Sequence, residues 1–239
     1  MGVFQNNLMG AAAAAASAGG GEFYSHQIAN SCRFDGSSAF LNKTFGSAGS
    51  RTTATLSSWV KRSAIGARDT IFSVGTGATL VQVRIGLNDQ FEVLYTNNDY
   101  ALISTAVFRD LSAFYHFVVT FDTGNGTDAY KIRVYVNGTE ITAWGTDNRS
   151  SFTGTQSIGQ AALTRIGCYS GGTSDYWNGY IAETVYIDGT ALAATSFGTN
   201  TNGVWIPDDV SGLTFSTNGF YLKFESSGDL GNDSSGNNN

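Results

Sequence analysis

The sequence is poor in charge, in proline and in long apolar runs, and these shortages exclude several kinds of protein. Only 13% of the 239 residues are charged, and proline occurs once. Glu, Lys and Arg, which usually cover exposed helix faces, are therefore scarce, and a helical protein is not expected. No apolar run approaches the roughly 20 residues of a membrane-spanning helix, so we expect no membrane insertion.

Basic residues are also few. Lys and Arg together number 13 against 19 Asp and Glu, which gives a net charge of -6 and a pI near 4.7. A surface that binds nucleic acid needs a concentrated positive field to contact phosphates. Nucleic acid is therefore not an expected partner.

Cysteine occurs only at Cys32 and Cys168, in opposite halves of the chain and inside apparent strands. Thiols so far apart in sequence cannot be paired from sequence alone. A disulfide and two buried free thiols both stay open, and free thiols are the simpler expectation. The N-terminus lacks the basic start of a secretory signal, and Asn6 stands where a myristoylation signal has Ser or Thr.

The most informative segment that is present runs from Tyr115 to Ile141. Aromatic and β-branched residues alternate with a period of two along residues 115–121 and again along residues 130–136. Such a period is typical of strands that bury one face, and Asn137-Gly138 supplies the positive φ angles of a type I′ turn. The segment predicts an antiparallel hairpin.

Similar runs, separated by Gly, Asn and Asp, follow one another from Gln27 to Phe224. So many short strands of similar length predict an all-β antiparallel sandwich or jelly roll, because a single open sheet with that many strands would curl or split into two. Only residues 191–197 suggest a helical turn. The predicted strands cover residues 31–35, 40–45, 53–62, 70–74, 80–87, 90–95, 102–105, 115–122, 130–136, 140–144, 164–169, 177–187 and 219–224.

Three segments differ in composition: residues 1–26, residues 27–225 and the polar, Gly- and Asn-rich residues 226–239. The first is an Ala-rich arm that carries Phe4, Leu8 and Met9 before Ala11–Ala16 and a triple glycine. Alanines bury too little apolar surface to form a stable helix alone. We therefore expect the arm to dock on a partner chain through Phe4, Leu8 and Met9; the alternative is a short helix packed on its own domain.

Four sequence segments, taken in chain order, resemble the concanavalin A-like lectin and laminin G-like jelly-roll superfamily. They are the opening strand pair in residues 31–40, the tryptophan strand in residues 54–61, the central hairpin in residues 114–138 and the closing strand in residues 177–188. Further sequence segments are similar to those of a group of bacteriophage virion proteins of this fold: residues 59–62, 107–110, 203–207, 218–222 and 230–236. The resemblance implies a concanavalin A-like jelly roll and a tail, fibre or capsid-surface component.

Fold does not decide function in this superfamily, which contains glucanases, lectins and structural modules. A retaining glycosidase needs its two carboxyls about 5 to 5.5 Å apart. On one strand this separation requires carboxylates two residues apart on the same face, and the glucanase branch has such a pair. Glu183 and Asp188 are five residues apart, a spacing that sends them to opposite faces. We therefore expect a structural role for Glu183, held by backbone N–H groups or by Arg165, and no enzyme.

The histidines and remaining aspartates give no strong metal signal. His116 alternates with core residues, so a structural histidine is expected, and His26 has no ligand partner at a suitable spacing. No cofactor is expected. Ca²⁺ stays open at strand ends, where Asp35, Asp122 and Asp188 more often form turns.

Sugar binding needs an aromatic platform and polar groups on loops at one end of a rigid scaffold. Two loops have this mixture, although the same residues can simply pack and form turns. The candidate carbohydrate-binding residues are Tyr95, Asn97, Asn98, Asp99 and Tyr100 in one loop, and Tyr169, Asp175, Tyr176 and Trp177 in the other.

The sequence therefore predicts a non-enzymatic virion or extracellular component that displays a jelly roll for contact with host-surface glycans or proteins. Its expected partners are other virion proteins bound through the arm and further copies of itself, with a trimer expected from phage fibres. One alternative is a secreted bacterial carbohydrate-binding or adhesion domain. Another is a degenerate glycoside hydrolase.

Overall fold

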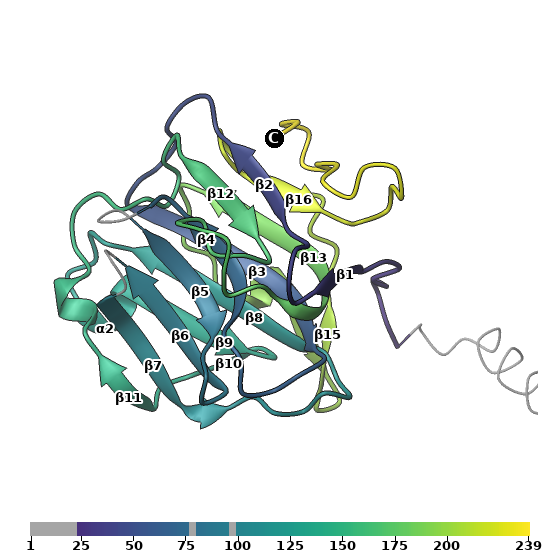
Figure 1. The fold of residues 1–239 in the computed structure, drawn as a ribbon, viewed down its shortest axis with the longest axis horizontal. Helices are drawn as coiled ribbons and strands as arrows, with labels where there is room; N and C mark the ends of the chain where they lie inside the picture. The colour runs from purple at the N-terminus through teal and green to yellow at the C-terminus, as the bar shows by residue number, and fades with distance from the viewer. Residues whose placement is uncertain (1–22, 77–79, 96–98) are drawn as a thin grey trace, which may run out of the picture.

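Two antiparallel β-sheets pack face to face in the computed structural model (Figure 1). The structure describes residues 23–76, 80–95 and 99–239. Each sheet has seven strands, and a two-stranded ribbon lies outside them. This arrangement confirms the predicted all-β antiparallel sandwich.

Sheet A has the order β1-β13-β3-β8-β9-β10, and β16 also pairs with β13. Its strands are β1 (Cys32–Asp35), β3 (Thr53–Arg62), β8 (Tyr115–Asp122), β9 (Ile132–Val136), β10 (Thr139–Glu140), β13 (Asn178–Asp188) and β16 (Phe220–Leu222). Sheet B has the order β11-β7-β6-β5-β4-β12-β2. Its strands are β2 (Leu41–Thr44), β4 (Asp69–Val74), β5 (Val81–Ile85), β6 (Gln90–Tyr95), β7 (Asp99–Val107), β11 (Trp144–Asp147) and β12 (Leu163–Ile166).

The main core lies between the two sheets, where alternate residues of each strand point inward. Val81 and Val83 of sheet B and Phe117 and Phe121 of sheet A belong to it and are almost completely buried. Trp177, just before β13, is the largest fully buried side chain. Burial of each such side chain contributes about 1.5 to 3 kcal/mol, so this layer supplies most of the stability.

The predicted hairpin is confirmed, with its turn between β9 and β10, but β9 starts later than predicted. Asn137 and Gly138 have φ angles of 46° and 77°, as a type I′ turn requires. Residues predicted as the start of a strand at Tyr130 instead form the short helix α2 (Asp128–Lys131). The backbone N–H of Tyr130 donates to the carbonyl of Thr127, and this local bond replaces strand pairing.

The predicted strand at residues 140–144 is also corrected, because the chain changes sheets there. Thr139 and Glu140 pair with β9 in sheet A, whereas β11 begins at Trp144 and pairs with β7 in sheet B. A continuous period of two does not reveal such a crossing, since the side chains go on alternating while the pairing partner changes.

Residues 189–218, called the outer layer below, cover part of the outer face of sheet A. The layer contains the 3₁₀ helix η3 (Ala194–Ser196) and the ribbon of β14 (Gly198–Thr201) and β15 (Val204–Pro207). Its Phe197 and Phe215 form a second core with Val118 and Ile187 of the sheet. The helical turn lies where the sequence predicts it, but β14 and β15 were not predicted.

Residues 226–239, called the tail below, pack beside β16, as the yellow end of the chain shows in Figure 1. Leu222 bridges to Asp233, and the backbone N–H of Ser234 donates to the carbonyl of Tyr221 at 2.8 Å. The tail therefore extends the edge of sheet A beyond its last named strand.

Both cysteines are buried as free thiols, and burial raises the pKa of Cys32. Two short 3₁₀ helices, η2 (Arg149–Ser151) and η3, and α2 are the helical elements within the described ranges. In that part of the chain, none of the helices has the length and apolar character needed to span a membrane.

Candidate functional site

Residues 167–177, called the 167–177 loop below, lie along the outer face of sheet B. Two backbone hydrogen bonds join the loop to β4: the N–H of Gly167 donates to the carbonyl of Ile71, and the N–H of Thr70 donates to the carbonyl of Asp175. Gly167 has φ +82°, and a Cβ there would lie 2.5 Å from the ring of Phe34. Only glycine therefore fits where the chain leaves β12 to form the loop.

Asp175 of this loop meets three polar side chains of β5 and β6. We call Gln82, Arg84, Glu92 and Asp175 the Asp175 cluster. Arg84 donates from Nε to Glu92 at 2.7 Å and from Nη1 to Asp175 at 2.8 Å. The side chain of Asp175 is 19% exposed, against 10% for Glu92 and 5% for Arg84. Arg84 uses one oxygen of each carboxylate, so acceptor capacity remains at the edge of the cluster that solvent reaches.

The predicted residues of this loop fall into two groups. Tyr169, Asp175 and Tyr176 are half-buried, and the Tyr176 ring lies 6.3 Å from that of Phe40. Trp177 is fully buried in the main core. Its indole has no open face for a sugar, and this corrects the expectation that Trp177 contacts ligand. Its alternation with the other inward residues of the closing strand explains the burial.

The second predicted loop lies at the same end of sheet B as the tip of the 167–177 loop. Val81 pairs with both Val74 and Tyr95, and Ser170 donates to the carbonyl of Gly75. Tyr95 at the end of β6 and Ser170 of the 167–177 loop therefore lie at the same end of the sheet, with β5 between β6 and β4.

Within the second loop, Asp99 is exposed, while Tyr95 packs edge-on to Phe152 at 5.4 Å. Tyr100 pairs in register with Leu94. Asn97 and Asn98 lie outside the described residues, as do Phe4, Leu8 and Met9 of the arm. Among the described residues of this loop, Asp99 is therefore exposed, whereas Tyr95 is half-buried and contributes to packing.

Gln82, Arg84 and Glu92 were not predicted as site residues. A signal for them is nevertheless present in the strands, because Gln82 and Arg84 alternate with Val81, Val83 and Ile85. Polar residues on the outward positions of two adjacent strands indicate a polar outer face. The partner that brings them together, Asp175, comes from a distant loop and could not be assigned from the sequence.

His116 has the structural role expected for it. Trp205 donates from Nε1 to His116 Nδ1 at 2.8 Å, so Nε2 carries the proton and donates to Ser57 Oγ at 2.7 Å. The imidazole also stacks on Trp59, with ring centroids 4.4 Å apart. Burial lowers the pKa of His116 to about 3, and no lone pair remains for a base or a metal.

Glu183 is bound by other residues than expected. Its carboxylate accepts hydrogen bonds from the hydroxyl of Tyr221 at 2.6 Å and from His26 Nε2 at 2.7 Å. Arg165 instead donates to the backbone carbonyls of Tyr169 and Gly172 in the 167–177 loop. Glu183 lies in a β-bulge of β13, with φ +42°, and the bulge redirects its side chain away from the predicted partner.

The three aspartates left open for Ca²⁺ all take part in local structure. Asp35 accepts the N–H groups of Ser37, Ser38 and Ala39, which lower its pKa together with the Ser38 hydroxyl. Asp122 accepts from Asn125 Nδ2, and Asp188 accepts from the N–H of Ser50. No group of three or more His, Cys, Asp and Glu side chains suited to a metal occurs among residues 23–76, 80–95 and 99–239.

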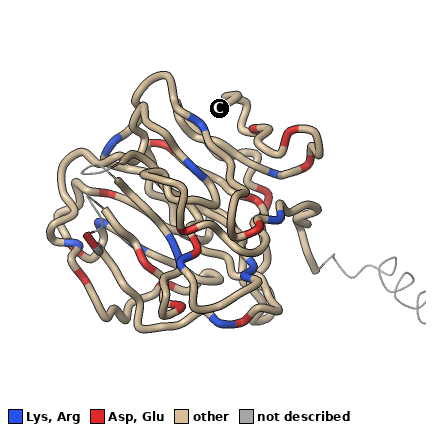
Figure 2. The backbone as a smooth tube through the Cα atoms, viewed as in Figure 1, with Lys and Arg blue, Asp and Glu red and all other residues tan. Residues whose placement is uncertain are grey.

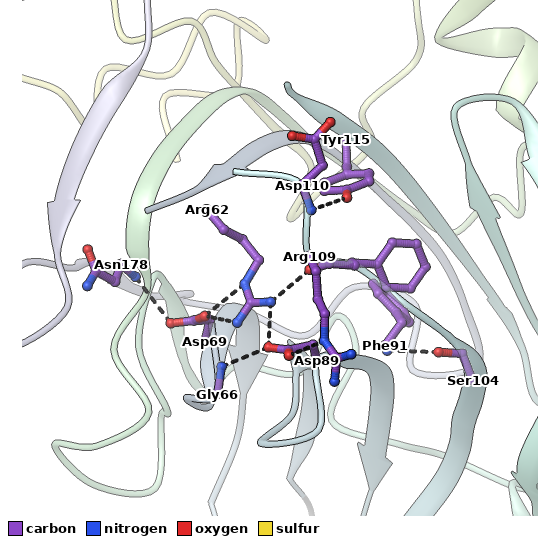
Figure 3. A network of polar contacts seen from close by, with 11 residues as sticks. Arg62, Gly66, Asp69, Asp89, Phe91, Ser104, Arg109, Asp110, Tyr115 and Asn178 are labelled. Atoms are coloured by element: carbon purple, nitrogen blue, oxygen red, sulfur yellow. Dashed lines mark hydrogen bonds and ion pairs between the residues drawn. The ribbon is translucent and has the colours of Figure 1, made fainter. Parts of the chain in front are cut away.

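A second buried charge cluster lies around Arg62, where β4 begins and β5 ends (Figure 3). Arg62 is fully buried and donates to Asp69 at 2.8 Å and to Asp89 at 2.9 Å. Asp89 also accepts from Gly66 and Arg109. The cluster joins three connections between strands, and its carboxylates are all bonded, so its role is structural.

The two aspartates of that cluster differ in pKa although both are buried. Burial raises the pKa of Asp69 to about 6 in spite of the bonds from Arg62. Burial also raises the pKa of Asp89, but the N–H of Gly66 and the guanidinium groups of Arg109 and Arg62 outweigh it and lower the pKa to about 2. The most accessible carboxylate of the cluster therefore stays ionised at neutral pH.

Comparison with known proteins agrees with this architecture. Residues 35–196 match a laminin G-like family described as the concanavalin A-like lectin/glucanases superfamily. A search of curated proteins finds no match.

Several solved structures are similar. A heptameric pentraxin from Limulus polyphemus has 18% identity and a TM-score of 0.51, over 70% of this chain and 80% of that one. Domain 4 of an extracellular arabinanase from Geobacillus stearothermophilus, in complex with arabinotriose, has 15% identity and a TM-score of 0.44, over 69% and 84%. Trypanosoma rangeli sialidase has 17% identity and a TM-score of 0.43, over 61% of this chain and 22% of that one. At these identities the pentraxin likeness shows the fold alone.

Proposed function

The chain belongs to the concanavalin A-like lectin/glucanases superfamily, and we propose that it is a non-enzymatic, glycan-binding component of a bacteriophage virion. Lectin-like jelly rolls carry their specificity on loops supported by a rigid sandwich. The glycan site that we propose is the 167–177 loop together with the Asp175 cluster.

The observation that carries this proposal is the bonding of Asp175 to Arg84, in a loop that also carries two half-buried tyrosines. Asp175 is fixed by the guanidinium at 2.8 Å, and its backbone carbonyl accepts from Thr70 at 3.0 Å. Tyr169 and Tyr176 are held on either side of it along the loop. A tyrosine ring packs on the apolar face of a pyranose, and a fixed carboxylate accepts from its hydroxyls.

The state of the carboxylates supports a binding role over catalysis. Glu183 is already bonded to Tyr221 and His26, and Asp188 to backbone N–H groups of Ser50 and Asn218. Glu92 and Asp175 are both bonded to Arg84. Each of these carboxylates already has a partner in the fold, which favours a binding role for the site.

The virion proposal rests on the sequence segments that resemble phage virion proteins and on the composition of the arm. We propose that Phe4, Leu8 and Met9 anchor the chain to other virion proteins, and that the assembled form is a homotrimer. Several copies would add avidity to weak glycan contacts. A secreted bacterial adhesion domain would use the same glycan site without the virion anchor.

A glycan array tests the binding proposal. We expect selective binding that Tyr176→Ala weakens about three- to tenfold, because an aromatic contact contributes about 0.5 to 1.5 kcal/mol beyond its buried area. Tyr130→Ala is a matched control, since Tyr130 is exposed but lies in α2. Selective binding that Tyr130→Ala reduces as much as Tyr176→Ala would contradict the site, and hydrolysis of a bound glycan would contradict the non-enzymatic role.

Cross-linking mass spectrometry of the particle tests the virion proposal. We expect residues 1–22 to cross-link to another virion protein, and their deletion to release the chain from the particle. Particles that retain the shortened chain at full occupancy would count against anchoring through the arm. Detection of the chain only in bacterial culture fluid would favour the secreted alternative.

A further inference from the structure

A cavity of about 330 Å³ opens where the two sheets diverge, between edge strand β2 of sheet B and the tail beside β16. In Figure 1 the yellow tail passes close to β2 and β16 at this edge. Its volume lies at the lower end of the roughly 300 to 1,000 Å³ typical of ligand sites. The 167–177 loop contributes no residue to its lining.

The inner wall of the cavity is apolar. Phe45, Phe220 and Leu222 line it, and they are 5%, 6% and 6% exposed. All three belong to the main core, so the cavity reaches the open edge of that core. An apolar floor with this little exposure can bury one face of a small ring without disturbing the sandwich.

The rim of the cavity is polar and comes from both sides. β2 supplies Asn42 and Lys43, and the tail supplies Asp229, Asn232 and Asn238, all exposed. These side chains offer amide, ammonium and carboxylate groups, which can both donate to and accept from hydroxyl groups. The rim therefore matches a ligand that carries several hydroxyls.

The tail wall is fixed in place before any ligand binds. The carboxylate of Asp233 accepts from the N–H groups of Tyr221, Ser235 and Asn239 at 2.8 to 2.9 Å. The side-chain amides of Asn237 and Asn239 both donate to the carbonyl of Gly219. A preformed wall loses little conformational entropy on binding, which favours even a small ligand.

The charges narrow the class of ligand. Lys43 is the cationic residue of the lining, while Asp229 and Asp233 are acidic, so an anion would meet net negative charge. A purely apolar ligand would remove water from the rim amides without replacing their hydrogen bonds. A neutral sugar ring satisfies both walls, since it has an apolar face and a hydroxyl edge.

We infer that this cavity is a second saccharide site, which takes one neutral sugar residue. β12 links it to the first site, because Thr164 and Ile166 line the cavity while Arg165, between them, donates to the 167–177 loop. Alternate residues of one strand thus support binding on its two sides. The inference shares the carbohydrate chemistry of the proposed function but does not depend on the loop site.

NMR titration of the full chain, labelled with ¹⁵N, tests this inference with D-glucose, D-galactose and N-acetyl-D-glucosamine as probes. We expect at least one sugar to shift the side-chain amide signals of Asn42, Asn232 and Asn238. Lys43→Ala and Asn232→Ala should each weaken that binding about three- to tenfold, as loss of one hydrogen bond does. Ser227→Ala is the control, because Ser227 is exposed on the tail outside the lining.

The outcomes separate the two sites. Shifts confined to the 167–177 loop would overturn the cavity site and leave the proposed function intact. Shifts at the cavity that survive Tyr176→Ala would support the inference, whatever happens at the loop. If none of the three sugars shifts the cavity amides, or if Ser227→Ala weakens binding as much as Asn232→Ala, the inference is wrong.

Discussion

At the scale of single residues, His116 shows how a polar side chain can be buried without cost to the fold. Both ring nitrogens are bonded, one to the indole of Trp205 and one to the hydroxyl of Ser57. The ring also stacks on Trp59, while the Trp205 indole lies beside it in nearly the same plane. Neutral imidazole fits this environment, and a protonated ring would lose the bond that Trp205 donates.

This environment predicts a pH-dependent stability. The unfolded chain binds a proton at His116 below pH 6.5, whereas the folded state does so only near pH 3. The contribution of His116 is therefore complete above pH 6.5 and falls by about 1.4 kcal/mol for each pH unit below it. Urea unfolding at several pH values should give a shallower decline for His116→Phe than for the wild type.

Asp69 acts in the opposite direction but does not disturb this comparison. Its pKa is raised to about 6 from a usual 3.8, so the folded state gains a proton first and gains stability as pH falls through that window. Asp69 is present in both proteins, and its effect cancels in the difference. Parallel stability curves for the two proteins would show that His116 is not neutral in the folded state.

The sequence predicts residue roles unevenly. The structural role of His116 follows from its alternation with core residues, but its partner Trp205 is 89 residues away and could not be assigned. Trp177 was proposed as a ligand contact because it follows a polar loop. It is nevertheless buried, since the first inward position of a strand depends on where pairing starts, which sequence fixes poorly.

At the scale of elements, tight turns decide how strands meet the outer layer. Gly138 lies in the turn between β9 and β10 with φ +77°, and a Cβ on it would lie 2.3 Å from the ring of Trp205. The turn therefore needs glycine for its backbone conformation and for contact with the outer layer.

Gly138→Ala should lower the free energy of unfolding by about 1 to 3 kcal/mol, because it combines strain at positive φ with overpacking. Gly126→Ala is the matched control, since Gly126 is exposed and nothing lies within 4 Å of a Cβ there. The control should stay within about 0.5 kcal/mol of the wild type. Equal values for the two variants in urea unfolding would contradict the contact with Trp205.

The Arg62 cluster joins the connections at one end of the sandwich. Arg62→Met would leave Asp69 and Asp89 without their buried cation, which should cost about 3 to 5 kcal/mol. Arg109→Met is the control, because the Arg109 side chain is 58% exposed and its surface pair contributes less than about 1 kcal/mol. A wild-type unfolding midpoint for Arg62→Met would contradict the structural role of the cluster.

Strands with a regular period were predictable, and strands formed by irregular segments were not. β3, β6 and β8 have the predicted boundaries because apolar and polar residues alternate through them. β14 and β15 escaped prediction, since Gly198–Thr201 is polar and short and pairs only with its neighbour. α2 and the crossing between β10 and β11 depend on tertiary contacts that a local pattern does not encode.

At the scale of the whole molecule, the tail is part of the fold. Its composition predicted a separate polar segment, because it offers few apolar residues to a core. It is instead fixed by Asp233, Asn237 and Asn239, whose side chains bond to backbone groups of residues 216–221. Hydrogen bonds of this kind leave no periodic signal in the sequence.

Deletion of residues 226–239 should therefore expose Phe220 and Leu222 at the edge of the main core. We expect a lower urea midpoint and stronger binding of an apolar dye such as ANS. The quadruple variant that replaces Ser226, Ser227, Gly228 and Leu230 by alanine keeps Asp233 and serves as a control with little effect. An unchanged midpoint after deletion would show that the tail adds nothing to the sandwich.

The contact of His116 with both Trp59 and Trp205 also gives the molecule an optical probe of its own. Trp205 belongs to the outer layer and Trp59 to sheet A, so the two indoles separate when that layer lifts from the sheet. Trp177 reports on the space between the sheets instead. Fluorescence of single-tryptophan variants can therefore reveal whether the layers open together or one after the other, without any attached label.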